Sequence, residues 1–368
     1  MLKLALAAAI IAVAIVVAAF LLLFLHHLQS AGAGGGVPII NSSWLSQWND
    51  SLAGTQPYPT MKAGEFLAVS YGNIAFASVN RSGASADLRM LYDANVSAIR
   101  IDLNYGPWLA NNTTQIATYD YFVNNISASN KSLVIADSAA EYYRQHQLTW
   151  SQFKAAWIQR VSTIAARYHP AYYIVVKEPP WYFPMIKGFP LYRPMNVSDW
   201  VNLTEQLVAA VKKASPNTKV GVAVSGDVYH SSSQLDLNYM VAARSIPGLD
   251  FLGFDIYDAN AWNDTSTFLK RYGSGGKQVW IAEAWSGTGG ASGGIVENAS
   301  RESLDAEWIK TIYLFAESIH AQYINPFFSN LFASYQPVAN NTYLPASFYQ
   351  NRTPVFYAYK NITPIGNP

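Results

Sequence analysis

Short apolar runs alternate with amphipathic stretches along most of this chain, from about residue 64 to residue 360. Each run is five to seven residues long, which is typical of a strand buried on both faces of a parallel sheet. The stretches between the runs place apolar residues at helical spacing. The expected strands are residues 66–70, 98–103, 132–137, 172–178, 219–225, 251–257, 278–284 and 322–328.

Eight strands, each followed by a helix, within about 300 residues predict a (β/α)8 TIM barrel. The runner-up is a doubly wound sheet, which would place a Gly-rich turn after the first strand. Ser70-Tyr-Gly-Asn73 lacks the G-x-G-x-x-G spacing of that turn. We therefore assign residues 61–368 to one barrel domain. Thr149 is the expected N-cap of the helix before the fourth strand.

An unbroken apolar run, Leu4 to Leu25, follows a single Lys at the start of the chain. A bilayer span needs about 20 apolar residues, whereas the apolar core of a signal peptide usually has about 7–15. Length therefore favours a membrane anchor within residues 1–30, with the barrel at the cell surface. Ala31-Gly-Ala33 has the form of a cleavage site, so secretion after cleavage is the alternative. Residues 31–60 form a linker and extension, for which a short helix packed across the barrel floor is one possibility.

Charge and cysteine content exclude several classes of function. The net charge is +1 and no basic tract is present, so nucleic acid is not an expected partner. The absence of Cys excludes disulfides, thiolate metal sites and a Cys nucleophile. The His residues have no metal-ligand spacing, and G-x-S-x-G does not occur. No metal or organic cofactor is expected.

Asn-x-Ser/Thr sequons are dense, and only 13% of residues are charged, against a usual value of about 25%. Together with the lack of Cys, this favours a protein with N-linked glycans on an outer surface, in an archaeal, acid-exposed setting. Chance in a chain rich in Asn, Ser and Thr is the alternative explanation. The sequons begin at Asn41, Asn49, Asn80, Asn95, Asn111, Asn112, Asn125, Asn130, Asn196, Asn202, Asn263, Asn298, Asn340, Asn351 and Asn361.

Two glutamates stand at the ends of expected strands: Glu178 closes the fourth and Glu283 the seventh. Side chains at the carboxyl ends of barrel strands face the mouth, where active sites occur. These two strands lie nearly opposite each other around the ring. Glycoside hydrolysis requires a pair of facing carboxyl groups. The alternative is a pair of salt bridges at the rim. Other polar residues at these strand ends are Arg100, Asp102, Asp137, Asp255 and Tyr257.

Aromatic side chains follow the same strands. Sugar rings present apolar faces that stack on aromatic side chains, although packing within loops would give the same pattern. The candidate substrate-binding residues are Tyr105, Trp108, Asp137, Trp181, Trp285 and Phe328.

Four motifs occur in order on strands two, four, six and seven: Arg100-Ile-Asp-Leu-Asn-Tyr105, Lys177-Glu178-Pro179, Asp255-Ile-Tyr257 and Glu283. In these motifs the chain resembles the clan A (4/7 superfamily) glycoside hydrolases, a group that contains many cellulases, β-mannanases, β-galactosidases and xylanases. The resemblance covers roughly residues 64–360. It implies a retaining enzyme that acts on a β-linked oligo- or polysaccharide by double displacement, and the N-terminal apolar run and the sequons predict that it acts outside the cell.

The resemblance also implies roles for individual residues. Glu178 would be the acid/base and Glu283 the nucleophile, with Arg100 and Tyr257 keeping Glu283 ionised and aimed. Asp255 stands where the clan often has His.

Lys177 stands where the clan has the Asn that contacts the sugar 2-hydroxyl, and this departure leaves a second hypothesis open. Strand alternation points Lys177 and Glu178 in opposite directions unless the strand bulges. If Lys177 faces the mouth, it would suit acidic pH or an anionic substrate. The alternative to an enzyme is a catalytically inactive, glycosylated surface protein that uses the barrel for glycan binding or surface assembly.

Overall fold

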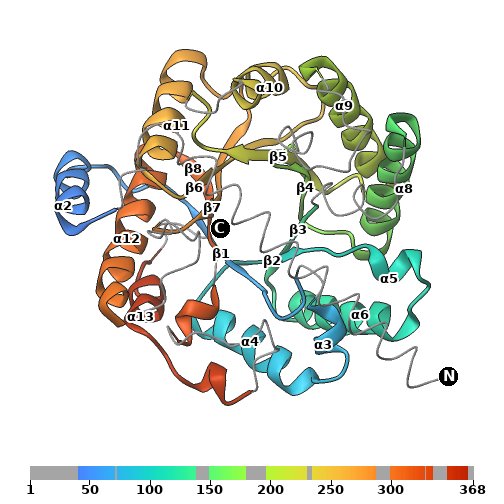
Figure 1. Cartoon of the computed structure of the whole chain (residues 1–368), viewed down its shortest axis with the longest axis horizontal. Coiled ribbons are helices and arrows are strands. Elements are labelled where there is room, and N and C mark those ends of the chain that lie inside the picture. The colour runs from blue at the N-terminus through green and yellow to red at the C-terminus, as the bar shows by residue number, and fades with distance from the viewer. Residues whose placement is uncertain are drawn as a thin grey trace.

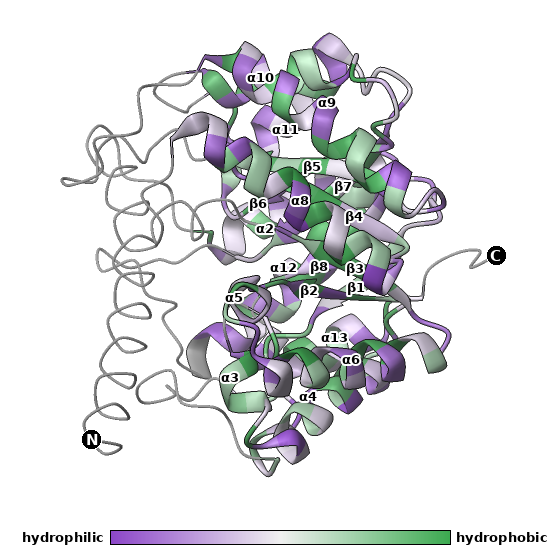
Figure 2. Ribbon diagram, turned by 90° about the vertical axis from the view of Figure 1, so that its right-hand side faces the viewer, coloured by the Kyte–Doolittle hydropathy of each residue, from purple (hydrophilic) through white to green (hydrophobic). Residues whose placement is uncertain are grey.

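The eight strands form a closed parallel barrel in sequence order, with the helices around its outside (Figure 1). This computed structural model describes residues 40–70, 73–137, 149–179, 196–229, 234–286, 299–327, 329–334 and 346–363. The (β/α)8 prediction is confirmed. The ring of helices carries hydrophilic and hydrophobic residues side by side (Figure 2), as expected for helices that bury one face against the barrel.

Strand and helix bounds follow the expected order. The strands are β1 (Met61–Glu65), β2 (Ala98–Asp102), β3 (Ser132–Ala136), β4 (Tyr172–Lys177), β5 (Lys219–Ser225), β6 (Phe251–Ile256), β7 (Gln278–Ala284) and β8 (Ala321–Pro326). The helices are α2 (Ser42–Ser51), α3 (Ile74–Ala77), α4 (Arg81–Asp93), α5 (Gly106–Leu109), α6 (Thr113–Ala128), α8 (Trp150–Tyr168), α9 (Val197–Ala214), α10 (Leu235–Ala243), α11 (Ala259–Tyr272), α12 (Ala299–Ser318) and α13 (Pro354–Lys360), with short 3-10 turns at Ser329–Phe332 and Phe348–Gln350. Thr149 caps α8 in a capping box with Gln152, as predicted.

Large aromatic rings fill part of the barrel interior. Trp280 stacks between Phe251 and Tyr323, with ring centroids 3.7 and 3.9 Å apart respectively. Small residues on neighbouring strands make room for these rings. A Cβ on Gly221 would lie 2.1 Å from the ring of Phe251, so only glycine fits there. These contacts make the interior a packed core, as is usual for barrels of this size.

The first strand differs from the prediction. It spans Met61–Glu65, and the predicted segment 66–70 instead forms the turn that follows it. The strand contains Lys62 and Glu65, which are both fully buried. A search for apolar runs passes over such a segment, because charged residues are seldom buried without partners.

The helix α2 also lies elsewhere than expected. It packs on the outside of the ring beside α12, not across the barrel floor (Figure 1). Its Trp48 stacks on Trp262 of α11 at 4.3 Å and lies 5.8 Å from the ring of Trp308 on α12. The indole stack explains the position, because these rings bury large apolar surfaces against one another.

Several sequon asparagines serve as helix caps. The side chains of Asn41, Asn80, Asn112 and Asn196 each accept a hydrogen bond from a backbone N–H in the first turn of a helix. The sequon serines Ser82 and Ser198 donate to two of these asparagines. Helix capping therefore accounts for part of the Asn-x-Ser/Thr pattern, and N-glycosylation stays a prediction.

The predicted anchor, Leu4 to Leu25, lies outside the described residues. Within the described ranges, from residue 40 to residue 363 with their gaps, no helix is long and apolar enough to cross a membrane.

Lys62 ties β1 to α13, the helix that follows the last strand. Its Nζ donates to the carbonyl oxygens of Tyr359 at 2.6 Å and Ile362 at 2.8 Å. The side chain is fully buried. The lysine therefore satisfies carbonyl groups that the end of a helix leaves without partners.

We expect Lys62→Met to lower the free energy of unfolding by about 2–4 kcal/mol, because it leaves buried carbonyl groups unpaired. Urea unfolding followed by circular dichroism measures this loss. Lys213→Met, at an exposed position on α9, is the matched control and should change stability by less than about 0.5 kcal/mol. Equal stability of the two variants would contradict this role of Lys62.

Candidate active site

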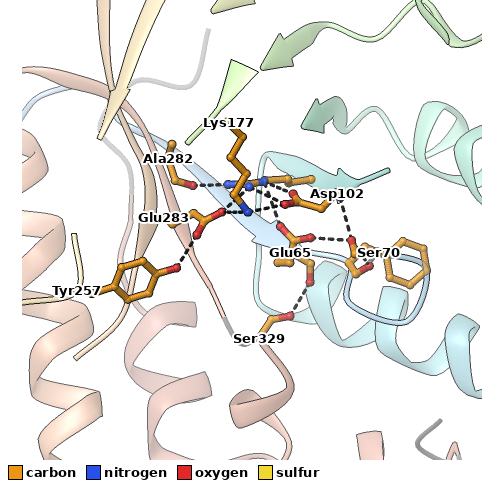
Figure 3. Close-up of polar contacts among 10 residues, drawn as sticks. Glu65, Ser70, Asp102, Lys177, Tyr257, Ala282, Glu283 and Ser329 are labelled. Carbon is orange, nitrogen blue, oxygen red and sulfur yellow. Dashed lines mark hydrogen bonds and ion pairs between the residues drawn. The ribbon is translucent and has the colours of Figure 1, made fainter. Parts of the chain in front are cut away.

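The guanidinium of Arg100 is fully buried and contacts side chains from β1, β2 and β7. Its Nη2 donates to Oε1 of Glu283 at 2.6 Å, and its Nη1 donates to the carbonyl oxygen of Ala282 at 2.6 Å. Its Nε and Nη2 bind the two carboxylate oxygens of Asp102 at 2.6 and 3.0 Å. Figure 3 shows Asp102, Glu65 and Glu283 gathered from three different strands. Arg100 thus contacts the carboxylate that the sequence predicts to be the nucleophile, and its role in aligning that group stays a prediction.

Lys177 faces the mouth because β4 is irregular. The register of β4 against β5 shifts between Ile174 and Val176. Val175 and Val176 consequently both pack outside the barrel, in the core between the strands and the helices. The side chain of the next residue, Lys177, turns inward. Lys177 Nζ lies 2.5 Å from Oε1 of Glu283 and 2.7 Å from Oδ2 of Asp102 (Figure 3). The structure therefore favours the inward of the two orientations left open by the sequence.

Glu178 follows the bulge in a left-handed backbone conformation, with φ 44°. Its backbone N–H donates to the carbonyl oxygen of Ala223 at 2.8 Å, which fixes the end of β4 against β5. The side chain of Glu178 is exposed. Non-glycine residues seldom adopt positive φ, and such conformations concentrate at functional sites.

The carboxylate of Glu283 is held through both of its oxygens. Oε1 accepts from the two cations Arg100 and Lys177, and Oε2 accepts from the hydroxyl of Tyr257 at 2.5 Å (Figure 3). The side chain is 4% exposed. Register shifts of β7 against both neighbours bring Ala282 and Glu283 to this position. Burial and the charge of Glu283 raise the pKa of Tyr257 well above its usual value, so the phenol keeps its proton.

The ammonium of Lys177 stays charged despite its burial. Burial alone would lower the pKa of Lys177, but the carboxylates of Asp102 and Glu283 outweigh it and raise the pKa above its usual range. Burial likewise acts to raise the pKa of Asp102, yet Arg100 and Lys177 hold it well below its usual range. The mouth therefore contains two cations and two carboxylates in direct contact.

Glu65 and Ser70 belong to this network, although the sequence did not single them out for the site. Glu65 ends β1, and its Oε2 lies 3.2 Å from Nε of Arg100. Ser70 Oγ lies 2.6 Å from Oε1 of Glu65 and accepts from the backbone N–H of Asp102 at 3.0 Å. Burial and the charge of Asp102 raise the pKa of Glu65 to about 8. The sequence missed Glu65 because residues 61–65 were not recognised as a buried strand that ends at the mouth.

Asp255 on β6 is in register with Glu283 on β7. It is 1% exposed, and neither carboxyl oxygen has a hydrogen-bond partner among the described residues. Burial and the neighbouring charges of Glu283 and Glu178 raise the pKa of Asp255 well above its usual value. Burial and these charges therefore favour the protonated form of Asp255 beside the predicted nucleophile.

The structure corrects the prediction that Asp137 and Trp285 bind substrate, because both side chains are buried. Asp137 is fully buried; it lies 2.7 Å from Nη2 of Arg160 on α8 and accepts a hydrogen bond from the hydroxyl of Tyr173. It therefore joins β3 to α8 instead of facing a substrate. Trp285 is 1% exposed and offers no accessible ring for stacking.

The remaining aromatic candidates fall into two groups. Tyr105 and Trp108 are half-buried and stack in parallel 5.7 Å apart beyond the end of β2, where sugar binding stays a prediction. Trp181 and Phe328 lie outside the described residues. The sequence missed Phe327, whose ring lies 5.1 Å from Lys177 Nζ and 6.3 Å from the ring of Tyr257. Phe327 thus shields the ion cluster on the β8 side.

No group of three His, Asp or Glu side chains in the described part of the chain could hold a metal ion. The carboxylates of Asp102 and Glu283 are each bound to Arg100 and Lys177.

Comparison with solved structures shows a similar fold in two family 10 xylanases and in a third protein, Fpglu1. A psychrophilic family 10 endo-β-1,4-xylanase is 12% identical, with 87% of this chain and 99% of that chain covered and a TM-score of 0.52. A family 10 endoxylanase from a sugarcane soil metagenome is 10% identical (86% and 99%, TM-score 0.52). Fpglu1 from Fervidobacterium pennivoraus is 10% identical (83% and 95%, TM-score 0.53). No family model and no curated protein matches the chain. The chain thus has the barrel fold of the clan that its motifs resemble.

Buried acids with raised pKa values predict how stability depends on pH. Glu65 is one such acid. Asp87 of α4 is another, because burial raises its pKa to about 7. Each binds its proton more tightly in the folded chain than in the unfolded chain. Its stabilising contribution is complete below the unfolded pKa of about 4 and is lost as the pH rises through the folded pKa. Asp102 acts in the opposite sense and contributes until the pH falls below about 4.

We therefore expect the melting temperature to be higher at pH 5 than at pH 8. Glu65→Gln and Asp87→Asn should each flatten this dependence, by at most about 1.4 kcal/mol per pH unit for each group. Asp50→Asn, at an exposed position on α2, should leave it unchanged. Differential scanning calorimetry between pH 4 and pH 9 measures the curves, and a melting temperature that rises from pH 5 to pH 8 would show that the assignment is wrong.

Proposed function

We propose that this chain is a retaining β-glycoside hydrolase with Glu283 as nucleophile and Glu178 as acid/base. The observation that carries the proposal is the carboxylate of Glu283 at the end of β7, held by Arg100 and Tyr257. Glu178 supplies an exposed carboxyl group at the end of β4 in the same mouth. The fold shared with xylanases supports the choice of reaction class.

Hydrogen bonding distinguishes the two oxygens of Glu283. Oε1 accepts from both cations, whereas Oε2 accepts from one phenol. Each carboxylate oxygen offers about two lone-pair sites, so Oε2 is the better placed to attack. In the first step, Oε2 bonds to the anomeric carbon, the glycosidic C–O bond breaks, and the proton of Glu178 passes to the leaving oxygen.

The second step returns the enzyme to its starting state. Glu178, now a carboxylate, takes a proton from water, and the water oxygen bonds to the anomeric carbon. The bond between that carbon and Oε2 breaks, so Glu283 regains its negative charge. Two displacements retain the β configuration of the sugar.

The charge balance of the mouth favours neutral glycans as substrates. Lys177 faces the mouth, but Asp102 and Glu283 neutralise its charge at 2.7 and 2.5 Å. We therefore do not propose the preference for anionic sugars that an inward lysine first suggested. The structures of similar fold include an endo-β-1,4-xylanase and a second endoxylanase, which makes β-1,4-xylan the first polymer to test.

Action outside the cell is part of the proposal and rests on the sequence. The apolar run within residues 1–30 supports a membrane anchor, with secretion after cleavage as the alternative. The sequons support N-linked glycans on the barrel surface.

A non-catalytic role in glycan binding or surface assembly is the second candidate. The contact of Lys177 with Glu283 favours it, because an ammonium group on a carboxylate weakens that carboxylate as a nucleophile. Loss of hydrolysis in defined glutamate variants distinguishes the two candidates.

We expect Glu283→Gln to abolish hydrolysis of aryl β-glycosides, because it removes the attacking carboxylate. Glu178→Ala should slow hydrolysis of 4-nitrophenyl glycosides far less than hydrolysis of xylan or other polymers, because a good leaving group needs little protonation. Initial rates on 4-nitrophenyl β-xyloside, β-xylobioside, β-glucoside and xylan measure both effects.

Glu205→Gln, at an exposed position on α9, serves as the matched control and should keep the parent rates. If the Glu283 and Glu178 variants also keep the parent rates, the catalytic assignment is wrong. A parent chain that cleaves none of these substrates but still binds a glycan would favour the non-catalytic role.

A further inference from the structure

We propose that Lys177 is a positioning residue that makes Glu283 a better leaving group, so that the glycosyl-enzyme breaks down faster than it forms. The inference rests on the proposed function and deepens it. It concerns the relative rates of the two displacements, which the fold and the glutamate pair leave undetermined.

Two cations share one oxygen of the nucleophile. Nζ of Lys177 lies 2.5 Å from Oε1 of Glu283, and Nη2 of Arg100 lies 2.6 Å from the same atom. The side chain of Lys177 is 8% exposed and that of Arg100 is fully buried. Phe327 covers Lys177 at 5.1 Å. Water therefore screens these charges weakly, and their effect on Glu283 is larger than it would be at an exposed site.

The charge of Glu283 changes during the reaction. When Oε2 bonds to the anomeric carbon, the carboxylate becomes a neutral ester, and the two cations lose one of the carboxylates that neutralise them. Asp102 remains paired with both cations, whereas the burial of Asp255 favours its protonated form in the resting site. The covalent intermediate is therefore destabilised relative to the free enzyme.

The second displacement reverses this loss. As water attacks and the C1–Oε2 bond breaks, the electron pair of that bond returns to Glu283, beside Arg100 and Lys177. A neutral amide at position 177 would provide hydrogen bonds but no charge. With Asn or Gln there, the intermediate would be more stable, its formation faster and its breakdown slower.

The test uses the full chain and 2,4-dinitrophenyl β-xyloside, β-xylobioside and β-glucoside in rapid-mixing experiments. The parent should release 2,4-dinitrophenolate linearly from the first turnover, because formation of the intermediate limits the rate. Lys177→Asn and Lys177→Gln should show a burst of about one equivalent per enzyme, then a turnover about tenfold to a hundredfold slower than their own burst. Intact mass after acid quenching should show one added glycosyl group in these variants only.

Lys177→Arg is the charge-retaining control and should remain without a burst. Methanol, which captures the intermediate, should accelerate turnover of the Asn and Gln variants and not of the parent or the Arg variant. A merely structural role for Lys177 predicts reduced activity without any burst. Thermal unfolding shows whether each variant is folded. If Lys177→Asn does not fold, the comparison is made with Lys177→Gln alone.

The outcomes separate this inference from the proposed function. A burst in the parent, or linear release in folded Asn and Gln variants, overturns the role of Lys177 while hydrolysis itself stands. If the parent releases no dinitrophenolate from any of these glycosides and acquires no glycosyl mass, the proposed function fails and the inference fails with it.

Discussion

The buried charge of Arg100 is the interaction on which the arrangement of the mouth depends. Its guanidinium lies within 3.2 Å of carboxyl groups that come from β1, β2 and β7, of which Asp102 and Glu283 form the ion cluster with Lys177. An isolated charge in the barrel interior would be strongly unfavourable, so these carboxylates are required for the cation to be buried. Conversely, the cation lets Asp102 and Glu283 lie close together inside the barrel. Removing Arg100 would leave several acids facing one another with only Lys177 between them.

Departures from regular strand geometry bring the chemistry into the mouth. The register shift in β4 turns Lys177 inward, and the shifts around β7 bring Glu283 to the cations. In a regular strand, successive side chains point to opposite faces. Without the register shifts, Lys177 or Glu283 would therefore face the helices. A bulge re-aims a side chain in this way, which is why bulges are frequent beside active sites.

The sequence predicted the fold in most of its elements, because buried parallel strands have a strong apolar signature. It misplaced β1, since Lys62 and Glu65 interrupt that signature and the carbonyl groups that Lys62 binds lie far away in the chain. It also left the direction of Lys177 open, since a bulge has no reliable signature in a single sequence.

The site was predicted in part for similar reasons. Arg100, Tyr257 and Glu283 meet as the motifs implied. Asp137 does not face the mouth: it follows Ala136, which points inward, so strand alternation would place it outward. Phe328 was predicted in place of Phe327. Sequence alone does not show which of two adjacent residues turns inward at the end of a strand.

The most direct test of the account is the position of a covalent label. A 2,4-dinitrophenyl 2-deoxy-2-fluoro-β-glycoside of a sugar that the protein cleaves should glycosylate the nucleophile and form an ester that hydrolyses slowly, because fluorine at C2 destabilises both transition states. Peptide mass mapping locates the attached sugar. We expect the label on Glu283, at the end of β7. A label on Glu178 or any other residue, with hydrolysis intact, would contradict it.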